Sequence, residues 1–240
     1  MFDWSKSDAI VLGVAILIIA VITTILTLTI RNSSEKIRKI PLHVITALII
    51  LLEVIRQVLY LTKQYDCSVI PLQFYNIVLL TFPFMIWGKG KLASIGNAMS
   101  IAVVSVCMLC LYLSPSGVLG SGTTASLFSN FDSFYLVMYY NLSILFFTIS
   151  FALRLFDYDM SAIVYIWVGL LIYSSIILVV SYWVEAFFIN PMEIVSELET
   201  LRVKFGMIIY SVVMFLLTCG IGGILFIIER GLYSCIKKKY

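Results

Sequence analysis

Long apolar runs alternate with short polar segments along almost the whole chain. Seven of these runs have about the 20 residues that an α-helix needs to cross the hydrocarbon core of a bilayer. They predict transmembrane helices over residues 9–30, 41–61, 69–87, 92–113, 134–155, 162–184 and 205–228. The pattern therefore predicts an all-α, polytopic membrane helix bundle that forms a single membrane domain over residues 1–240.

One segment between the runs has a helical pattern of its own. In residues 190–203, Asn190 suits a helix cap, Pro191 suits the first helical position and Glu193 suits the first turn. Apolar residues then recur at helical spacing, which predicts a short amphipathic helix at the outer membrane interface. This helix is either a lid over an outer opening or a connector that rests its own apolar stripe on the membrane.

Composition supports the membrane assignment. The chain is 62% hydrophobic and only 12% charged, whereas soluble domains carry about 25% charged residues, and its mean hydropathy is +1.07. A chain this apolar could not cover its surface in water, so the bilayer is its expected solvent. The first run is too long for a signal-peptide core and has no basic front, which indicates a retained helix.

Basic residues predict the orientation of the chain. Most of the 16 Lys and Arg residues lie in one set of connections, at residues 31–39, at Lys89 and Lys91, and in the tail at 237–239. Loops rich in Lys and Arg stay in the cytoplasm. We therefore expect a multi-pass protein of the cell membrane with its N-terminus outside and its C-terminus in the cytoplasm. The net charge of +3 follows from this bias and gives no indication of nucleic-acid binding.

The second run carries a polar stripe in an otherwise apolar helix. Thr46, Glu53, Arg56, Gln57 and Tyr60 share one face at helical spacing. A charge at the bilayer centre costs at least about 2.5 kcal/mol, so it is normally paired and faces the bundle interior. The spacing of three predicts that Glu53 and Arg56 pair with each other along the helix.

Other runs offer matching polar groups. Gln73 and Asn76 follow Pro71 in the third run. The first part of the fifth run contains several tyrosines, followed by Asn141. Gathered in a bundle, these faces would form a polar, tyrosine-lined cavity that opens outwards. The candidate ligand-binding residues are Glu53, Arg56, Gln57, Gln73, Asn76, Tyr139 and Asn141.

Three interpretations of this cavity stay open: a structural hydrogen-bond network, a pocket for binding or transport, and a catalytic pocket. Catalysis lacks its usual motifs, since His43 is the only histidine and no HExxH, GxSxG or His/Cys zinc pattern occurs. His43 is also expected near the inner end of its helix, away from the polar cluster. The sequence therefore favours a protein that is not an enzyme, with no catalytic residue, cofactor or metal site.

Several motifs resemble those of a known family. The pair Glu53-x-x-Arg56, the stretch IPLQFYNI from Ile70 to Ile77 and the opening FDSFYLVMYYN of the fifth run together resemble the YwaF-like integral membrane proteins of Gram-positive bacteria. That family resembles a eukaryotic transmembrane acyltransferase acting on phospholipids. The resemblance implies the helical fold of the family.

The chemistry that the resemblance implies is altered at several positions, and the opening FDSFYLVMYYN lacks the histidine that the family carries there. The family's histidine in the third run falls on Gln73, its cysteine falls on Tyr75, and an early histidine corresponds to Asp8. Gln73 keeps hydrogen bonding but cannot shuttle a proton near neutral pH. The resulting hypothesis is a YwaF-like membrane protein with a polar cavity for a lipid head group or a small polar ligand, in contact with membrane lipid. The alternatives are a divergent lipid acyltransferase or hydrolase, and a small-molecule permease component.

Overall fold

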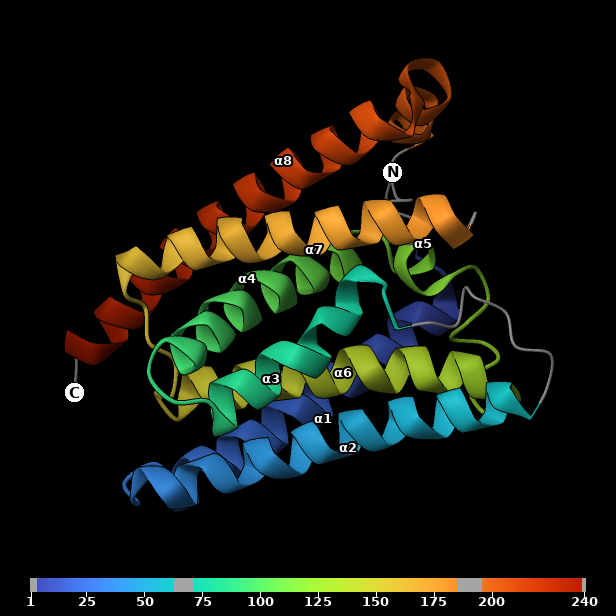
Figure 1. Ribbon diagram of the computed structural model, residues 1–240. Coiled ribbons are helices and arrows are strands. Elements are labelled where there is room, and N and C mark those ends of the chain that lie inside the picture. Colours follow the sequence, from blue (N-terminus) through green and yellow to red (C-terminus); the bar gives the residue numbers. More distant parts are fainter. Residues whose placement is uncertain (1–3, 63–70, 185–195, 239–240) are drawn as a thin grey trace. The chain divides into compact units, whose positions relative to one another are not determined.

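The computed structural model describes residues 4–62, 71–184 and 196–238. All regular secondary structure in these ranges is helical, in agreement with the fold class that the apolar runs predict. The elements are α1 (Lys6–Ile30), α2 (Glu35–Leu61), the 3-10 turn η2 (Phe74–Ile77), α3 (Val78–Trp87), α4 (Lys91–Leu113), α5 (Pro115–Leu119), α6 (Phe131–Ala152), the 3-10 turn η3 (Met160–Ala162), α7 (Ile163–Val184) and α8 (Ser196–Lys238) (Figure 1).

Six described helical segments are long and apolar enough to cross a membrane. They are α1, α2, α4, α6, Met160–Ile177 and Phe215–Ser234. Within the third expected run, the described helical part is Phe74–Trp87, which is too short to be among the six. It begins with the 3-10 turn η2, after Pro71 and after Gln73, whose backbone is extended. Seven spans therefore remain a prediction.

Large apolar side chains cover the outer faces of these helices. On α1, Leu17 is 67% exposed and Leu28 is 81% exposed. In water each exposed apolar Å² would forgo about 25 cal/mol of burial energy, whereas lipid tails solvate such side chains as well as a protein core does. The exposed apolar surface suits a membrane-embedded protein.

Contacts between residues divide the chain into two compact units, which we describe separately. The first unit contains the described residues of 1–71 and 107–155, and the second contains those of 72–106, 156–184 and 196–238. Helix α4 contributes to both, with its first part in the second unit and residues 107–113 in the first. The expectation of one membrane domain stays a prediction.

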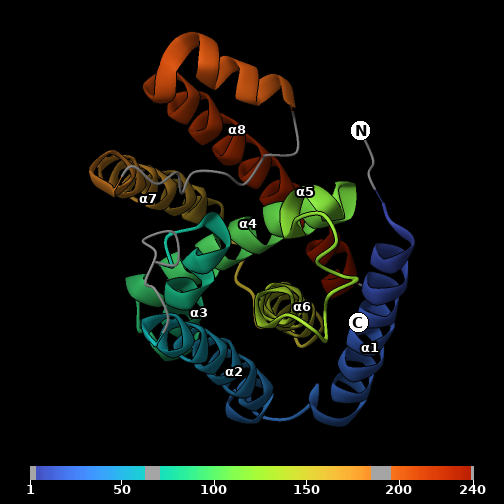
Figure 2. The same cartoon turned by 90° about the vertical axis from the view of Figure 1, so that its right-hand side faces the viewer.

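In the first unit, α6 packs against both α1 and α2 (Figure 2). Tyr135, Tyr139 and Phe146 recur on α6 at helical spacing and are completely buried. The hydroxyl groups of Thr23 on α1 and Thr148 on α6 lie 3.3 Å apart and form a polar contact between the helices. α6 is thus the buried centre of this unit.

Asp8 is a structural residue at the start of α1. Its Oδ2 accepts hydrogen bonds from the backbone N–H and the hydroxyl of Ser5, which completes a capping box at the helix N-terminus. Its Oδ1 accepts a 2.6 Å hydrogen bond from Thr124. Asp8 is 5% exposed, and its carboxyl group ties the segment before α6 to α1.

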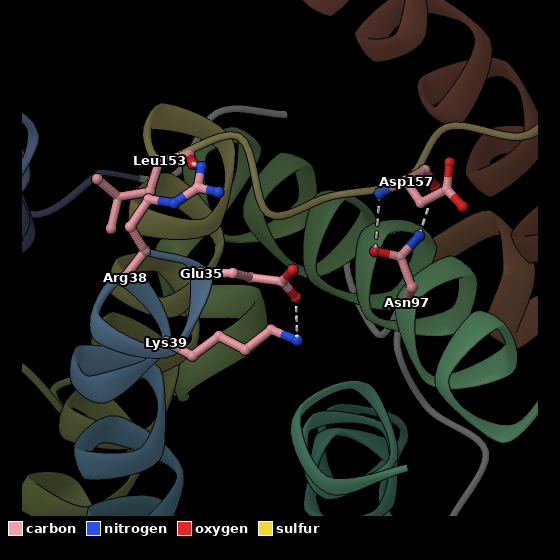
Figure 3. A network of polar contacts seen from close by, with 6 residues as sticks. All are labelled: Glu35, Arg38, Lys39, Asn97, Leu153 and Asp157. Atoms are coloured by element: carbon pink, nitrogen blue, oxygen red, sulfur yellow. Dashed lines mark hydrogen bonds and ion pairs between the residues drawn. The ribbon is translucent and has the colours of Figure 1, made fainter. Parts of the chain in front are cut away.

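The C-terminal end of α6 is fixed by a reversed backbone turn. Arg154 has φ +57°, and the N–H of Leu155 donates to the carbonyl of Ser150, which together form a Schellman motif. From the start of α2, Nη1 of Arg38 donates a 2.7 Å hydrogen bond to the carbonyl of Leu153 (Figure 3). One orphan carbonyl at the end of α6 is therefore satisfied by α2.

In the second unit, small residues let helices approach α4 closely. A Cβ on Gly96 of α4 would lie 2.4 Å from the backbone nitrogen of Met85 in α3. Gly169 of α7 faces Met99 of α4, and Gly222 of α8 faces Ala102 of α4. Close approach through small residues is typical of helix packing in membranes.

Helix α8 is bent at Gly206, where φ is +83° and the backbone is not helical. The interfacial helix expected at residues 190–203 begins before the described part of α8, since residues 190–195 lie outside the described residues. From Ser196 the chain is helical up to the bend at Gly206, after which it continues as the last long apolar segment. An interfacial position of the first part stays a prediction.

Asn97 fastens the connection between α6 and η3 to α4. Its Nδ2 donates to the carbonyl of Asp157 at 2.5 Å, and its Oδ1 accepts from the N–H of Asp157 at 3.2 Å (Figure 3). One buried side chain thus satisfies both backbone groups of a residue in the connection.

Candidate functional site

The candidate site of the first unit is centred on the carboxylate of Glu53, a residue that is 6% exposed. One oxygen accepts a 2.6 Å hydrogen bond from Nε2 of Gln57, one turn further along α2. The other oxygen accepts a short hydrogen bond from the hydroxyl of Tyr135 on α6. Glu53 therefore joins α2 to α6 at the interface that forms the centre of the unit.

Arg56 lies beside this carboxylate among aromatic rings. Its Nη1 is 3.9 Å from Oε1 of Glu53, a long ion pair between two buried side chains. Its guanidinium carbon lies 4.7 Å from the ring centre of Tyr135 and 5.8 Å from that of Tyr60. Cation–π contacts of this kind contribute about 0.5–2 kcal/mol, with the larger values in desolvated sites. The spacing of three on α2 does bring the two charges together, and the rings hold the arginine.

Of the two expected site residues on α6, Tyr139 lies in this cluster and Asn141 does not. Tyr139 joins the cluster, because its ring centre lies 5.4 Å from that of Tyr135. Asn141 donates to the carbonyl of Val137 in its own helix. It follows Tyr135 by six positions, about 240° around the helix axis, and the structure shows no hydrogen bond from it to Glu53 or Arg56.

Gln73 and Asn76 belong to the second unit. Gln73 precedes η2, and its carbonyl accepts from the N–H of Asn76 at 2.8 Å. Asn76 is 3% exposed. Nearby, the hydroxyl of Tyr173 on α7 donates a 2.6 Å hydrogen bond to the carbonyl of Leu72. These polar groups fasten the start of the short third helical segment.

A pocket of about 340 Å³ lies in the first unit where α2 ends and α6 begins. Its lining residues are Leu59, Tyr60, Ser129, Asn130, Phe131 and Asp132. Tyr60 links the pocket to the cluster through its contact with Arg56. Asp132 supplies a partly exposed carboxylate, and no hydrogen bond or ion pair to that carboxylate is found within the described residues.

A second polar cluster, in the second unit, was missed by the sequence analysis. Glu229 of α8 lies within the last apolar segment, and its carboxyl contacts Ser105 of α4 and Tyr158 of the connection before η3. Burial raises the pKa of the Tyr158 hydroxyl, which therefore stays a neutral O–H donor. The sequence signal for this cluster was Glu229 itself, directly after the predicted run 205–228. A charged residue in that position is usually interpreted as the end of a transmembrane helix.

Within the described residues no group of three or more His, Cys, Asp or Glu side chains is arranged to hold a metal ion. No protein-family model matches this chain, and comparisons with curated proteins and with solved structures find no match either.

Proposed function

We propose that this chain is a multi-pass membrane protein that binds a ligand carrying an ammonium group, without classical catalysis. The ligand is either a small free amine or the amine head group of a phospholipid. The observation that carries the proposal is a pocket of about 340 Å³ whose lining residues include the acidic Asp132 and the aromatic Tyr60 and Phe131. A carboxylate with aromatic side chains is the combination that recognises organic ammonium ions.

The Glu53 cluster supports this pocket rather than contacting the ligand. Its carboxylate already accepts hydrogen bonds from Tyr135 and Gln57. Tyr135 stands one turn after Asp132 on α6, and Tyr60 stands two turns after Glu53 on α2. The bond between Glu53 and Tyr135 therefore fixes the two helix ends that line the pocket.

The orientation of the chain belongs to the same proposal. We place the N-terminus outside and the C-terminus in the cytoplasm of a cell membrane, because basic residues gather in one set of connections. The pocket, at the end of α2 and the start of α6, then opens to the outside. Replacing Lys6 or Lys36, both exposed, by cysteine in a cysteine-free chain tests this. An impermeant thiol reagent added outside should label the first and not the second.

We also retain the YwaF-like assignment as a proposal. It is supported by the Glu53-x-x-Arg56 pair and by the IPLQFYNI stretch. In this chain Glu53 joins α2 to α6 through Tyr135, which fits a binding protein better than an acyltransferase.

Ligand binding is tested by thermal unfolding of the protein in lipid nanodiscs. Ethanolamine added to phosphatidylglycerol discs, or replacement of that lipid by phosphatidylethanolamine, should raise the melting temperature of the unaltered protein. Stabilisation by ethanolamine identifies a free amine, and stabilisation by the lipid alone identifies a head group.

Asp132→Asn should abolish that stabilisation, because it removes the charge and keeps the shape of the side chain. Asp157→Asn is the matched control, since Asp157 is an exposed carboxylate of the second unit. Equal stabilisation of the unaltered protein and Asp132→Asn would overturn the proposal.

A further inference from the structure

Glu229 is a carboxyl group within an apolar membrane segment, and no cationic partner for it is found in the part of the chain that the structure describes. It lies in Phe215–Ser234, next to the lipid-exposed Ile227 and Ile228. Among the described residues no Lys or Arg forms an ion pair with it. An isolated carboxylate in hydrocarbon is costly, and protonation removes that cost.

Two contacts of the Ser105 hydroxyl bear on the protonation of Glu229. Its oxygen is 2.7 Å from the carbonyl of Ile101 and 2.5 Å from Oε1 of Glu229. A serine hydroxyl has one hydrogen and can donate only one of these two bonds. The carbonyl of Ile101 can only accept. Both contacts are full two-centre hydrogen bonds at the same time when Glu229 carries a proton and donates it to Ser105, whereas an ionised Glu229 would have to share the single hydroxyl hydrogen with Ile101.

The second oxygen of Glu229 agrees with this assignment. Oε2 lies 3.4 Å from the hydroxyl of Tyr158, which is a donor. A neutral carboxyl group can donate from Oε1 and accept at Oε2. The ring of Tyr158 packs against Phe226 and Tyr233 at centre distances of 5.5 and 5.0 Å, which holds the donor in place.

The other charged groups near Glu229 point elsewhere. Arg230, the next residue, is exposed. Hydrogen bonds from Ser161 lower the pKa of Asp159, and the charge of Arg230 adds to this effect, so Arg230 lies near Asp159. On α7, the side that faces α8 at Gly223 presents the indole of Trp167, which does not titrate. Ser105 and Tyr158 are thus the groups that respond to Glu229.

We propose that Glu229 is a proton-binding site inside the membrane segment of the second unit. In the protonated state Glu229 donates to Ser105, and Ser105 donates to the carbonyl of Ile101. When the proton leaves Oε1 for water, the hydroxyl of Ser105 rotates and donates to the ionised carboxylate. The carbonyl of Ile101 loses only this additional bond, since it also accepts a backbone N–H within α4. The site can therefore exchange a proton with a single bond rotation and does not depend on the ammonium pocket.

Infrared spectroscopy of the protein in nanodiscs tests this proposal. At neutral pH the unaltered protein should show the C=O stretching band of a protonated carboxyl group, shifted in D₂O. Glu229→Gln should remove the band, while Glu53→Gln should leave it unchanged, because Glu53 accepts from Tyr135 and Gln57 as a carboxylate. Ser105→Ala should shift its frequency. Absence of the band, or its survival in Glu229→Gln, would overturn the proposal.

Chemical labelling of the unaltered protein provides a test that needs no variant to fold. The O–H of a protonated carboxyl group adds across a C=N bond of a lipid-soluble carbodiimide to form an O-acylisourea, and transfer of the acyl group from oxygen to nitrogen then gives a stable N-acylurea with no leaving group. Peptide mass spectrometry should find this adduct on Glu229 at neutral pH, with labelling that decreases as the pH is raised. An unlabelled Glu229 at neutral pH would contradict the assignment.

Discussion

The hydroxyl of Tyr135 donates a hydrogen bond to the carboxylate of Glu53 across 82 positions of sequence. Both side chains are buried, and the bond joins α6 to α2. Hydrogen bonds to charged groups are worth about 1.5–3 kcal/mol, roughly twice as much as neutral ones. This contact makes the polar stripe of α2 part of the helix interface instead of a free wall of a cavity.

Tyr135→Phe should therefore destabilise the protein by about 1–3 kcal/mol, because the Glu53 carboxylate loses a donor inside the bundle. Thermal unfolding in detergent would show this as a lower melting temperature. Tyr165→Phe is the matched control, since Tyr165 on α7 is half-buried and has no hydrogen bond from its hydroxyl in the described structure. Equal effects of the two changes would show that the bond to Glu53 does not contribute.

Glu53 and Arg56 should depend on each other's charge. Glu53→Gln keeps an acceptor for Tyr135 but leaves Arg56 without its counter-charge, and Arg56→Met leaves Glu53 as a buried anion. Breaking a buried pair costs about 3–5 kcal/mol in soluble proteins. Each single change should therefore lower the melting temperature more than the double change does. If the losses in melting temperature add up in this double-mutant cycle, Glu53 and Arg56 do not interact energetically at their separation of 3.9 Å.

The part of this site that the sequence predicts is the part that lies on one helix. Helical spacing alone places Glu53, Arg56 and Gln57 on one face of α2, and the cost of charge in lipid predicts that this face is buried. It does not identify Tyr135 as the partner, because several tyrosines open the same run and only tertiary packing selects one of them. Glu229 escaped prediction for the same reason, since its partners lie on α4 and in a connection.

The apolar runs predict the helices, but in the third run the described helix is shorter than the run. The run predicts a helix from residue 69, but the described helical turns begin at Phe74, after Pro71 and an extended Gln73. The hydrogen bond from Tyr173 to the Leu72 carbonyl stabilises this non-helical start. Hydrophobicity reports solvation by lipid and gives no information about such local backbone choices.

Gly96→Ala should destabilise the second unit by about 1–3 kcal/mol, the usual cost of overpacking. The added Cβ would meet backbone and Cβ atoms of Met85 and Phe84 at 2.4–2.7 Å, and these atoms cannot move aside without shifting α3. Gly220→Ala on α8 is the control, since no atom lies within 4 Å of its added Cβ. It should be neutral or stabilising by about 0.5–1 kcal/mol through helix propensity. A Gly96→Ala protein as stable as Gly220→Ala would contradict the close packing of α3 on α4.

Arg154→Gly should stabilise the first unit. Arg154 has the left-handed conformation that glycine adopts freely at this position of a Schellman motif, and a non-glycine residue there costs about 1–2 kcal/mol. Its Nε and Nη2 atoms are also buried without a hydrogen-bond partner within the described residues. Both penalties disappear in Arg154→Gly, whereas the favourable interaction of a cation with the C-terminal end of α6 is worth only about 0.3–1 kcal/mol.

Arg154→Ala separates the two penalties, because alanine removes the guanidinium but keeps the backbone strain. The glycine variant should be more stable than the alanine variant by about 1 kcal/mol, measured by thermal unfolding in detergent. Equal stabilities would show that the reversed turn after Leu153 is not strained. An alanine variant less stable than the unaltered protein would show instead that the guanidinium of Arg154 stabilises the end of α6, in contradiction to its two buried donors without partners.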